Sequence, residues 1–158
     1  MYLLNFVLTG FLSGIVATIV MTLTEIPSWK KWGLPWVFEW HENQILSRRF
    51  LNIQNRNKVH FKAVFFLHFL IGALAGIADP FIVSLFEFLN IGSIPVYLLG
   101  ISYGFVLWML TLVPIHKPIT GLSPWNHPLG HLPVIASLGG HLIYGFILVI
   151  MYIIIIHG

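Results

Sequence analysis

The sequence predicts an all-α membrane protein, a bundle of four transmembrane helices in a single domain of 158 residues. Hydrophobic residues make up 58% of the chain and charged residues only 8%, whereas soluble domains carry roughly 25% charged residues. A water-soluble fold cannot cover its surface with so few charged side chains. A soluble enzyme or nucleic-acid-binding protein is therefore excluded, and we expect a lipid bilayer and no nucleic acid as partner.

Four apolar stretches come close to the roughly 20 residues that a bilayer requires. The first covers about residues 2–24, which carry no charge. The second covers about 63–86 and is interrupted at Asp79-Pro80, where the helix either kinks or ends, with Asp79 then capping a short segment that follows. The third and fourth cover about 94–115 and 133–156. With four spans, both termini lie on the same side of the membrane.

The basic residues predict the orientation, because all of them fall in the two connections that lie on one side. They are Lys30, Lys31, Arg48, Arg49, Arg56, Lys58 and Lys62 in residues 25–62, and Lys117 in residues 116–132. The positive-inside rule places this side in the cytoplasm. We therefore expect a multi-pass protein of the cell membrane with both termini outside.

The first of these connections, residues 25–62, is rich in tryptophan. Trp29, Trp32, Trp36 and Trp40 recur at steps of three and four residues among the basic residues Lys30, Lys31, Arg48 and Arg49. Such a pattern is typical of amphipathic helices in the headgroup region, with the aromatic and basic side chains as interface anchors. The alternative is that a protein partner docks on this segment.

Small residues recur one turn apart in each span. The glycines concerned are Gly10, Gly14, Gly72, Gly76, Gly100, Gly104 and Gly145, and such faces allow close helix packing in lipid. A shift of 90 residues also lays Gly10 and Gly14 onto Gly100 and Gly104, and the segment beginning at His68 resembles the one beginning at His141. These matches indicate a parallel internal repeat, as in some transporters.

Two histidines lie inside the spans at similar depth. His68 and His141 are roughly 9 and 12 Å from the cytoplasmic ends of their helices at 1.5 Å per residue. Glu25 and His116 end the first and third spans slightly nearer the surface. The four residues predict one pocket, with one side chain from each helix.

This pocket is compatible with several chemistries. Imidazole and carboxylate groups suit a transition metal, and paired histidines suit a b-type haem, with Gly72 and Gly145 leaving room for the porphyrin. Alternatively, His68, Glu25 and His141 relay protons. In the simplest case each histidine forms a hydrogen bond with a neighbouring helix.

Several motifs resemble those of an uncharacterised family of small four-helix prokaryotic membrane proteins, a domain of unknown function. They are Gly10-x-x-x-Gly14 followed by Met21-Thr22, His68-x-x-x-Gly72, Tyr103-Gly104 followed by Trp108, and Ser137-Leu-Gly-Gly-His141-Leu-Ile-Tyr-Gly145. The resemblance implies the four-helix fold and draws attention to His68, His141 and Tyr144. It implies no activity.

The chain carries no phosphate-binding glycine loop and no serine–histidine–acid order. We therefore expect a non-catalytic accessory subunit that packs against other integral-membrane subunits in a larger complex, by analogy a redox complex such as an archaeal ammonia-oxidising or respiratory one. The alternatives are a stand-alone protein that binds haem or a metal, and a small transporter with a histidine-based proton path.

Overall fold

The computed structural model describes residues 2–52, 59–88, 95–127 and 129–157, and this part of the chain contains helices and loops but no strands. Four long apolar helices dominate it: α1 (Tyr2–Trp32), α3 (Phe61–Phe88), α4 (Val96–Leu110) with its continuation, and α6 (Leu132–His157). Each is long and apolar enough to cross a membrane, as a multi-pass membrane protein requires.

Three prolines lie inside these helices instead of ending them. The helix α1 passes Pro27 and reaches Trp32, so Glu25 belongs to the helix and not to the connection that follows. The helix α3 continues through Pro80 to Phe88 and does not end at Asp79, the alternative that the Asp79-Pro80 pair left open, so Asp79 lies inside the helix. After α4, Pro114 lies in a π-helical stretch, Thr111–His116, that leads into the short α5 (Lys117–Thr120). Proline lacks the N–H for the regular α-helical bond, and such a defect favours a π turn.

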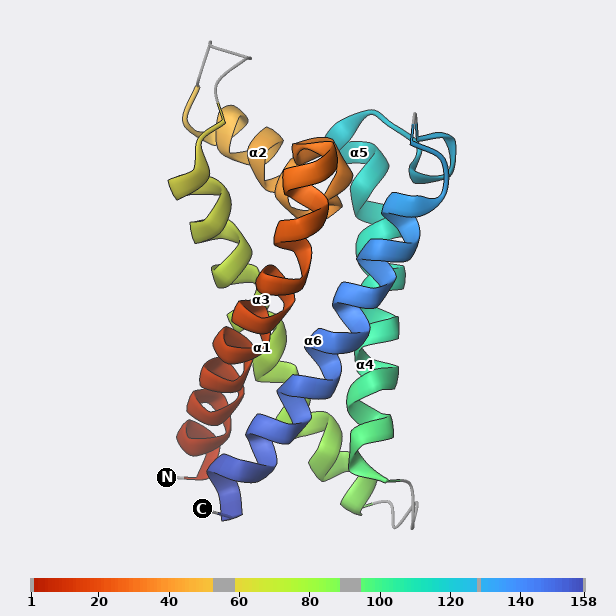
Figure 1. Ribbon diagram of the computed structural model, residues 1–158. Helices are drawn as coiled ribbons and strands as arrows, with labels where there is room; N and C mark the ends of the chain where they lie inside the picture. Colours follow the sequence, from red (N-terminus) through yellow and green to blue (C-terminus); the bar gives the residue numbers. More distant parts are fainter. Residues whose placement is uncertain (1, 53–58, 89–94, 128, 158) are drawn as a thin grey trace.

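The four helices form two closely packed pairs, α1 with α3 and α4 with α6, and α1 also packs along α6 (Figure 1). Glycines allow the two helices of each pair to approach each other closely. A Cβ atom on Gly10 would lie 2.6 Å from the carbonyl oxygen of Gly76, and one on Gly14 equally close to that of Gly72. In the second pair the carbonyl oxygen of Gly100 occupies the place of a Cβ on Gly145. Gly104 meets the backbone of His141 in the same manner.

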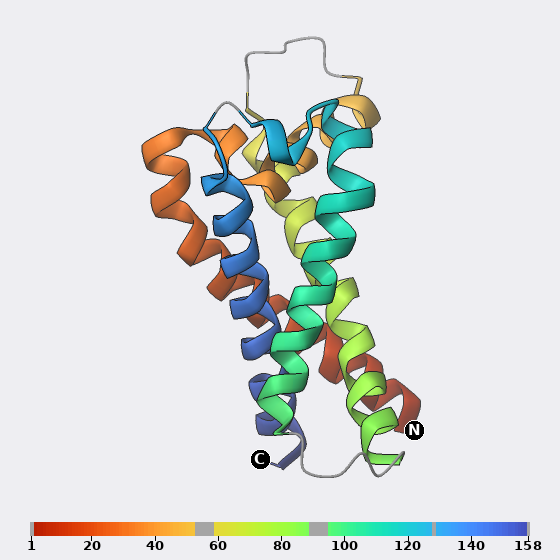
Figure 2. The same ribbon diagram turned by 90° about the vertical axis from the view of Figure 1, so that its right-hand side faces the viewer.

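A further helix, α2 (Phe38–Phe50), lies across one end of the bundle, opposite the two termini (Figures 1 and 2). It packs mainly on α3 and also touches α5 and α6. Its buried side chains include both apolar and polar groups: Phe38, Trp40, Glu42, Asn43, Gln44 and Ser47. The helix α2 therefore carries polar groups into the end of the bundle and covers it.

The tryptophans before and within α2 correct one of our expectations. Trp36 and Trp40 are only 3% and 0% exposed and belong to a core cluster with Val37 and Val64, so they are not anchors in the headgroup region. Trp32 is 39% exposed, and the ammonium of Lys31 lies 4.4 Å from the centre of its ring. The tryptophan pattern is therefore compatible with a helix that packs on the bundle as well as with a helix at the membrane surface.

Candidate functional site

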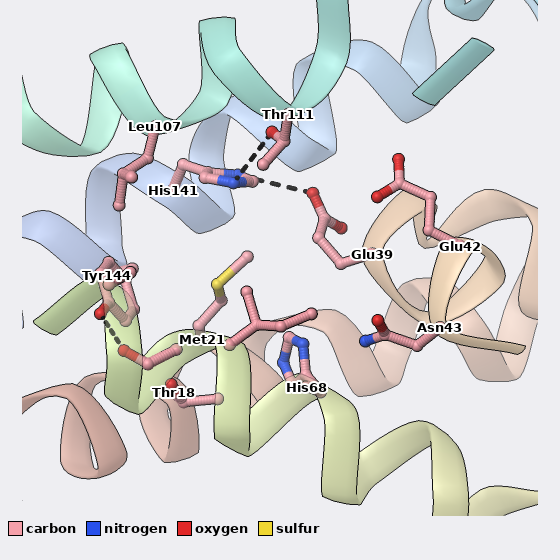
Figure 3. Close-up of a pocket in the computed structure, with 13 residues that line it drawn as sticks. Thr18, Met21, Glu39, Glu42, Asn43, His68, Leu107, Thr111, His141 and Tyr144 are labelled. Atoms are coloured by element: carbon pink, nitrogen blue, oxygen red, sulfur yellow. Dashed lines mark hydrogen bonds and ion pairs between the residues drawn. The ribbon is translucent and has the colours of Figure 1, made fainter. Parts of the chain in front are cut away.

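A cavity of about 100 Å³ lies between the four long helices where α2 covers them. Its polar lining comes from every one of these elements, and Figure 3 shows how the side chains converge: Thr18, Glu39, Glu42, Asn43, His68, Thr111, His141 and Tyr144. A volume of this size has room for several water molecules, and the polar groups in its largely apolar lining offer them partners. The cavity is therefore a place where protons and small polar species can be held inside the bundle.

The first of three histidine–carboxylate pairs joins α1 and α3. The Nε2 atom of His68 lies 3.7 Å from Oε2 of Glu25. The same oxygen accepts a hydrogen bond of 2.8 Å from the indole N–H of Trp40 on α2. All three side chains are buried. The carboxylate of Glu25 thus links α1 to both α3 and α2.

The second pair joins α2 and α6. The carboxylate of Glu39 accepts a 2.5 Å hydrogen bond from the hydroxyl of Ser137, and its Oε1 lies 3.5 Å from Nδ1 of His141. That nitrogen is also 2.9 Å from the carbonyl oxygen of Ser137, which can only accept, so Nδ1 carries a proton. In the neutral imidazole Nε2 is then an acceptor, and the hydroxyl of Thr111 lies 3.4 Å from it.

The third pair lies where α2 meets the π-helical stretch. Oε1 of Glu42 is 2.7 Å from Nδ1 of His116, whose ring packs against Phe38 with 4.3 Å between the ring centres. Burial raises the pKa of Glu42, and this effect outweighs the hydrogen bond with His116, which lowers it. Glu42 therefore retains a proton to higher pH than an exposed glutamate does.

The neighbouring His41 responds to the same environment. Its half-buried position lowers its pKa to about 4, and the nearby His116, His127 and Arg48 act in the same direction. His127, whose ring lies 5.7 Å from that of Phe38, also has a lowered pKa because of burial. Both histidines are therefore neutral at physiological pH.

A second cavity of about 220 Å³ lies between α1 and α6, next to the first. Glu25, Ser28 and Ser137 contribute to its polar lining, and Glu39 lines both cavities. Glu39 also lies within electrostatic range of Glu25 and His68. Glu39 therefore stands at the boundary between the two cavities and couples the first two pairs.

Of the four residues that we predicted to form one pocket, the structure places His68 and His141 on the first cavity and Glu25 on the second, whereas His116 lines neither. Glu25 and His68 lie together, but His141 is paired with Glu39 and His116 with Glu42. Neither Glu39 nor Glu42 was among the predicted site residues, because residues 25–62 were expected to lie at the membrane surface. Their spacing of three residues in the segment Phe38-Glu39-Trp40-His41-Glu42 puts both on one helical face, which is the signal that could have identified them.

The expected metal or haem site has little support in this arrangement. Within the described residues, no group of three or more histidine and acidic side chains is placed to hold a metal ion. The space beside Gly72 and Gly145, which we expected to admit a porphyrin, is filled by Thr18 of α1 and by the backbone of Gly100 in α4. The two glycines therefore leave no open space beside His68 and His141 for a porphyrin.

The charge of the site depends on protons. In the described part of the chain, neither of the two cavities is lined by lysine or arginine, and the partners of Glu25, Glu39 and Glu42 in these pairs are histidines, which carry a charge only when protonated. A buried carboxylate needs a compensating charge or a proton. Imidazole is the side chain whose ordinary pKa lies nearest to physiological pH, so the charge balance here can change by proton exchange.

The sequence matches no model of a protein family, no curated protein and no solved structure.

Proposed function

We propose that this chain is a small integral-membrane protein that takes up and transfers protons at the site formed by Glu25, Glu39, Glu42 and their histidine partners. The observation that carries the proposal is the pairing of three carboxylates, two buried (Glu25, Glu42) and one partly buried (Glu39), with three histidines around water-sized cavities. Ionisable groups inside a membrane bundle are costly, and they commonly mark proton relays. A purely structural network has no need for three such pairs.

The geometry supports a stepwise transfer. A proton on Nδ1 of His116 can pass to Glu42 across 2.7 Å, which leaves a neutral imidazole and a neutral carboxylic acid. Glu42 and Glu39 line the same cavity, and a water molecule there can accept the proton from one and deliver another to the next. Glu39 then shares it with His141 or passes it toward Glu25, since it lines the second cavity as well.

The arrangement in two helix pairs supports a transporter-like architecture. Gly10 and Gly14 contact the α3 glycines in the first pair, as Gly100 and Gly104 contact α6 in the second. This correspondence supports the parallel repeat that the sequence suggests, in which His68 of one half corresponds to His141 of the other. Transporters of this kind bind substrates and coupling ions at the interface between the two halves.

The charge distribution supports the cytoplasm as the side on which α2 lies. The exposed Lys30 and Lys31 lie in the last turn of α1, Arg49 in the last turn of α2, Lys62 in the first turn of α3 and Lys117 at the start of α5. These helix ends lie opposite the termini (Figure 1), whereas Arg56 and Lys58 lie outside the described residues. Exposed Lys30, Lys31 and Trp32 are also suited to anchor this end in the headgroup region. We expect a thiol introduced by Lys117→Cys to be protected from a membrane-impermeant reagent added to intact cells. Labelling of Lys117→Cys but not of Leu3→Cys from outside would show that the orientation is the opposite one.

Proton flux into vesicles tests the function. The purified protein is placed in phospholipid vesicles that contain a pH-sensitive dye, and a potassium gradient with valinomycin sets the membrane potential. We expect inward flux above that of empty vesicles, and a loss of about tenfold or more with Glu39→Gln, the size of effect typical for a proton-transfer group. Leu23→Ala serves as control because Leu23 is 60% exposed and lines neither cavity. Wild-type flux equal to that of empty vesicles contradicts the proposal.

A second proposal, the accessory subunit, is favoured by the exposure of α4. Only 22% of its most apolar stretch is buried, compared with 44% in α1, and the exposed side chains include Phe105, Val106, Met109 and Leu110. Such a face suits a neighbouring membrane subunit as well as lipid. Purification from native membranes in mild detergent should yield a second polypeptide that is lost with Phe105→Arg and kept with Phe66→Arg. A monomer or homodimer without another chain contradicts this proposal.

A further inference from the structure

One face of α3 runs from His68 at the cavity to Asp79, toward the end of the bundle where the termini lie, and two backbone carbonyls between them accept hydrogen bonds from other helices. His68, Gly72, Ala75 and Asp79 follow each other at steps of four, three and four residues, which keeps them on one helical face. At 1.5 Å per residue this row is roughly 16 Å long. It begins at the histidine–carboxylate site and ends at an acidic residue that the site does not include.

Two tyrosines from the other helix pair bind this face of α3. The hydroxyl of Tyr144 on α6 donates a 2.6 Å hydrogen bond to the carbonyl oxygen of Gly72, and Tyr144 also lines the first cavity. The hydroxyl of Tyr103 on α4 donates a 2.6 Å hydrogen bond to the carbonyl oxygen of Ala75. The two hydroxyls are therefore attached to successive turns of α3 between the cavity and Asp79.

Asp79 is buried, with 2% of its surface exposed. Within the described residues, its Oδ2 atom has no hydrogen-bond partner, and no ion pair involves this residue. It lies within electrostatic range of both Tyr103 and Tyr144. Because α3 continues through Pro80, the carboxyl group does not cap a helix end. An unpaired buried carboxyl group reduces stability, so a structural role does not explain it.

We propose that Asp79 is a second proton-holding residue, linked to the histidine–carboxylate site through the hydroxyls of Tyr144 and Tyr103. This inference rests on the proposed function, because it extends the proton path from that site toward the opposite face. In this proposal Asp79 exchanges protons toward the end of the bundle where the termini lie. The two tyrosines connect Asp79 with the histidine–carboxylate site.

The transfer needs no ionised tyrosine. A neutral hydroxyl accepts a proton on a lone pair from a donor on the cavity side while its own proton leaves to an acceptor on the Asp79 side, so the hydroxyl stays neutral and one positive charge moves. The last acceptor is the Asp79 carboxylate, which becomes a neutral acid. Each hydroxyl must first turn away from its carbonyl acceptor, Gly72 or Ala75, and this gives the path two points of control.

Beyond Asp79 lies a mainly apolar cluster of buried side chains. Val83, one turn further along α3, packs with Val149 and Tyr152 of α6 in a buried cluster. In this structure the cluster separates Asp79 from the nearer end of the bundle. We therefore expect its opening to limit the rate of proton exchange with that side, and Val83→Ala to increase it.

The vesicle assay described above distinguishes this inference from the function on which it rests. We expect Asp79→Asn and Tyr103→Phe each to lower the Glu39-dependent flux by about tenfold or more, and Val83→Ala to raise it. Thermal unfolding in detergent shows that each variant is folded; Tyr103→Phe keeps the test valid if Asp79→Asn does not fold. Flux that requires Glu39 but is unchanged in folded Asp79→Asn and Tyr103→Phe overturns the inference alone. Absence of flux in the wild type overturns both.

Discussion

The glycine contacts and the α2 end of the bundle are built in opposite ways. At the glycine contacts, backbone atoms of one helix occupy the space of a missing side chain on the next, as Gly145 and Gly100 show. At the α2 end, ionisable side chains face cavities of about 100 and 220 Å³. The tight contacts cannot rearrange without a large cost, whereas the polar end can change its protonation. The bundle thus combines a rigid frame with a chemically variable site.

The largest effect is expected from overfilling a glycine contact. A Cβ on Gly76 would lie 2.7 Å from Cα and 2.9 Å from the nitrogen of Gly14, and neither backbone atom can move without separating α1 from α3. We expect Gly76→Ala to lower the free energy of unfolding by about 3 kcal/mol, the upper range for overpacking. Unfolding in a mixed-detergent titration measures this value.

Gly139→Ala is the matched control for this substitution. A Cβ there meets nothing within 4 Å, and the better helix propensity of alanine should leave stability unchanged or raised by up to about 1 kcal/mol. Equal stability of the two alanine variants would show that the glycine contacts are looser than described.

A smaller loss is expected where α2 is attached to the site. Trp40→Phe removes the indole N–H that donates to Glu25 and leaves a buried carboxylate oxygen without this donor. We expect a loss of about 1–3 kcal/mol in unfolding free energy and a change in proton flux. The control is Trp32→Phe, because Trp32 is 39% exposed. If both variants lose the same stability, the Trp40 hydrogen bond does not hold α2 in place.

The pH dependence of stability compares two residues of α2 with opposite shifts. The lowered pKa of His41, about 4, means that the unfolded chain binds a proton first as pH falls below about 6.5, so stability is lost between these values. The raised pKa of Glu42 has the opposite sign: the folded chain keeps its proton longer, so stability is lost as pH rises through that pKa. His41→Gln should flatten the acid-side loss, and Glu42→Gln should steepen it.

Thermal unfolding of these two variants and the wild type across about pH 4 to 7 measures both slopes. Identical pH profiles for all three proteins would mean that neither residue is coupled to folding.

The smallest effect is expected at the exposed edge of α2. The guanidinium of Arg49 donates a 2.8 Å hydrogen bond to the carbonyl oxygen of Ile119, but it does so at the surface. Arg49→Gln should change the unfolding free energy by no more than about 0.5 kcal/mol. A loss of stability as large as that of Trp40→Phe would show that α2 is held mainly by its exposed edge and not by its buried face.

Hydropathy was sufficient to predict four apolar helices, because each span needs an uninterrupted apolar stretch and the sequence provides four. The glycine positions could be found for a similar reason, since close helix contacts need small residues at regular steps. The arrangement of α2 could not be predicted from the sequence. Its tryptophans and charges suit a membrane surface as well as a protein interior, and only tertiary packing buries Trp36, Trp40 and Glu42.

The site was therefore predicted in part. The depth of His68 and His141 follows from helix length, but their carboxylate partners depend on how residues 25–62 fold back. Glu39 reaches His141 across about one hundred residues of sequence, a contact that no local pattern contains. Asp79 illustrates the same limit, because the Asp-Pro pair suggested a helix end while neighbouring packing keeps the helix continuous.

The central claim, that the α2 end exchanges protons within a coupled set of histidines and carboxylates, is tested most directly at the Trp40 indole. Its N–H donates to Glu25, and its ring lies 6.3 Å from that of His68, so the ¹⁵N-indole resonance reports protonation on either partner. Trp40→Phe assigns the resonance. We predict that it shifts between about pH 4 and 8 and that His68→Gln and Glu39→Gln each change the titration curve. A resonance that stays constant over this range, in folded protein, would contradict the account.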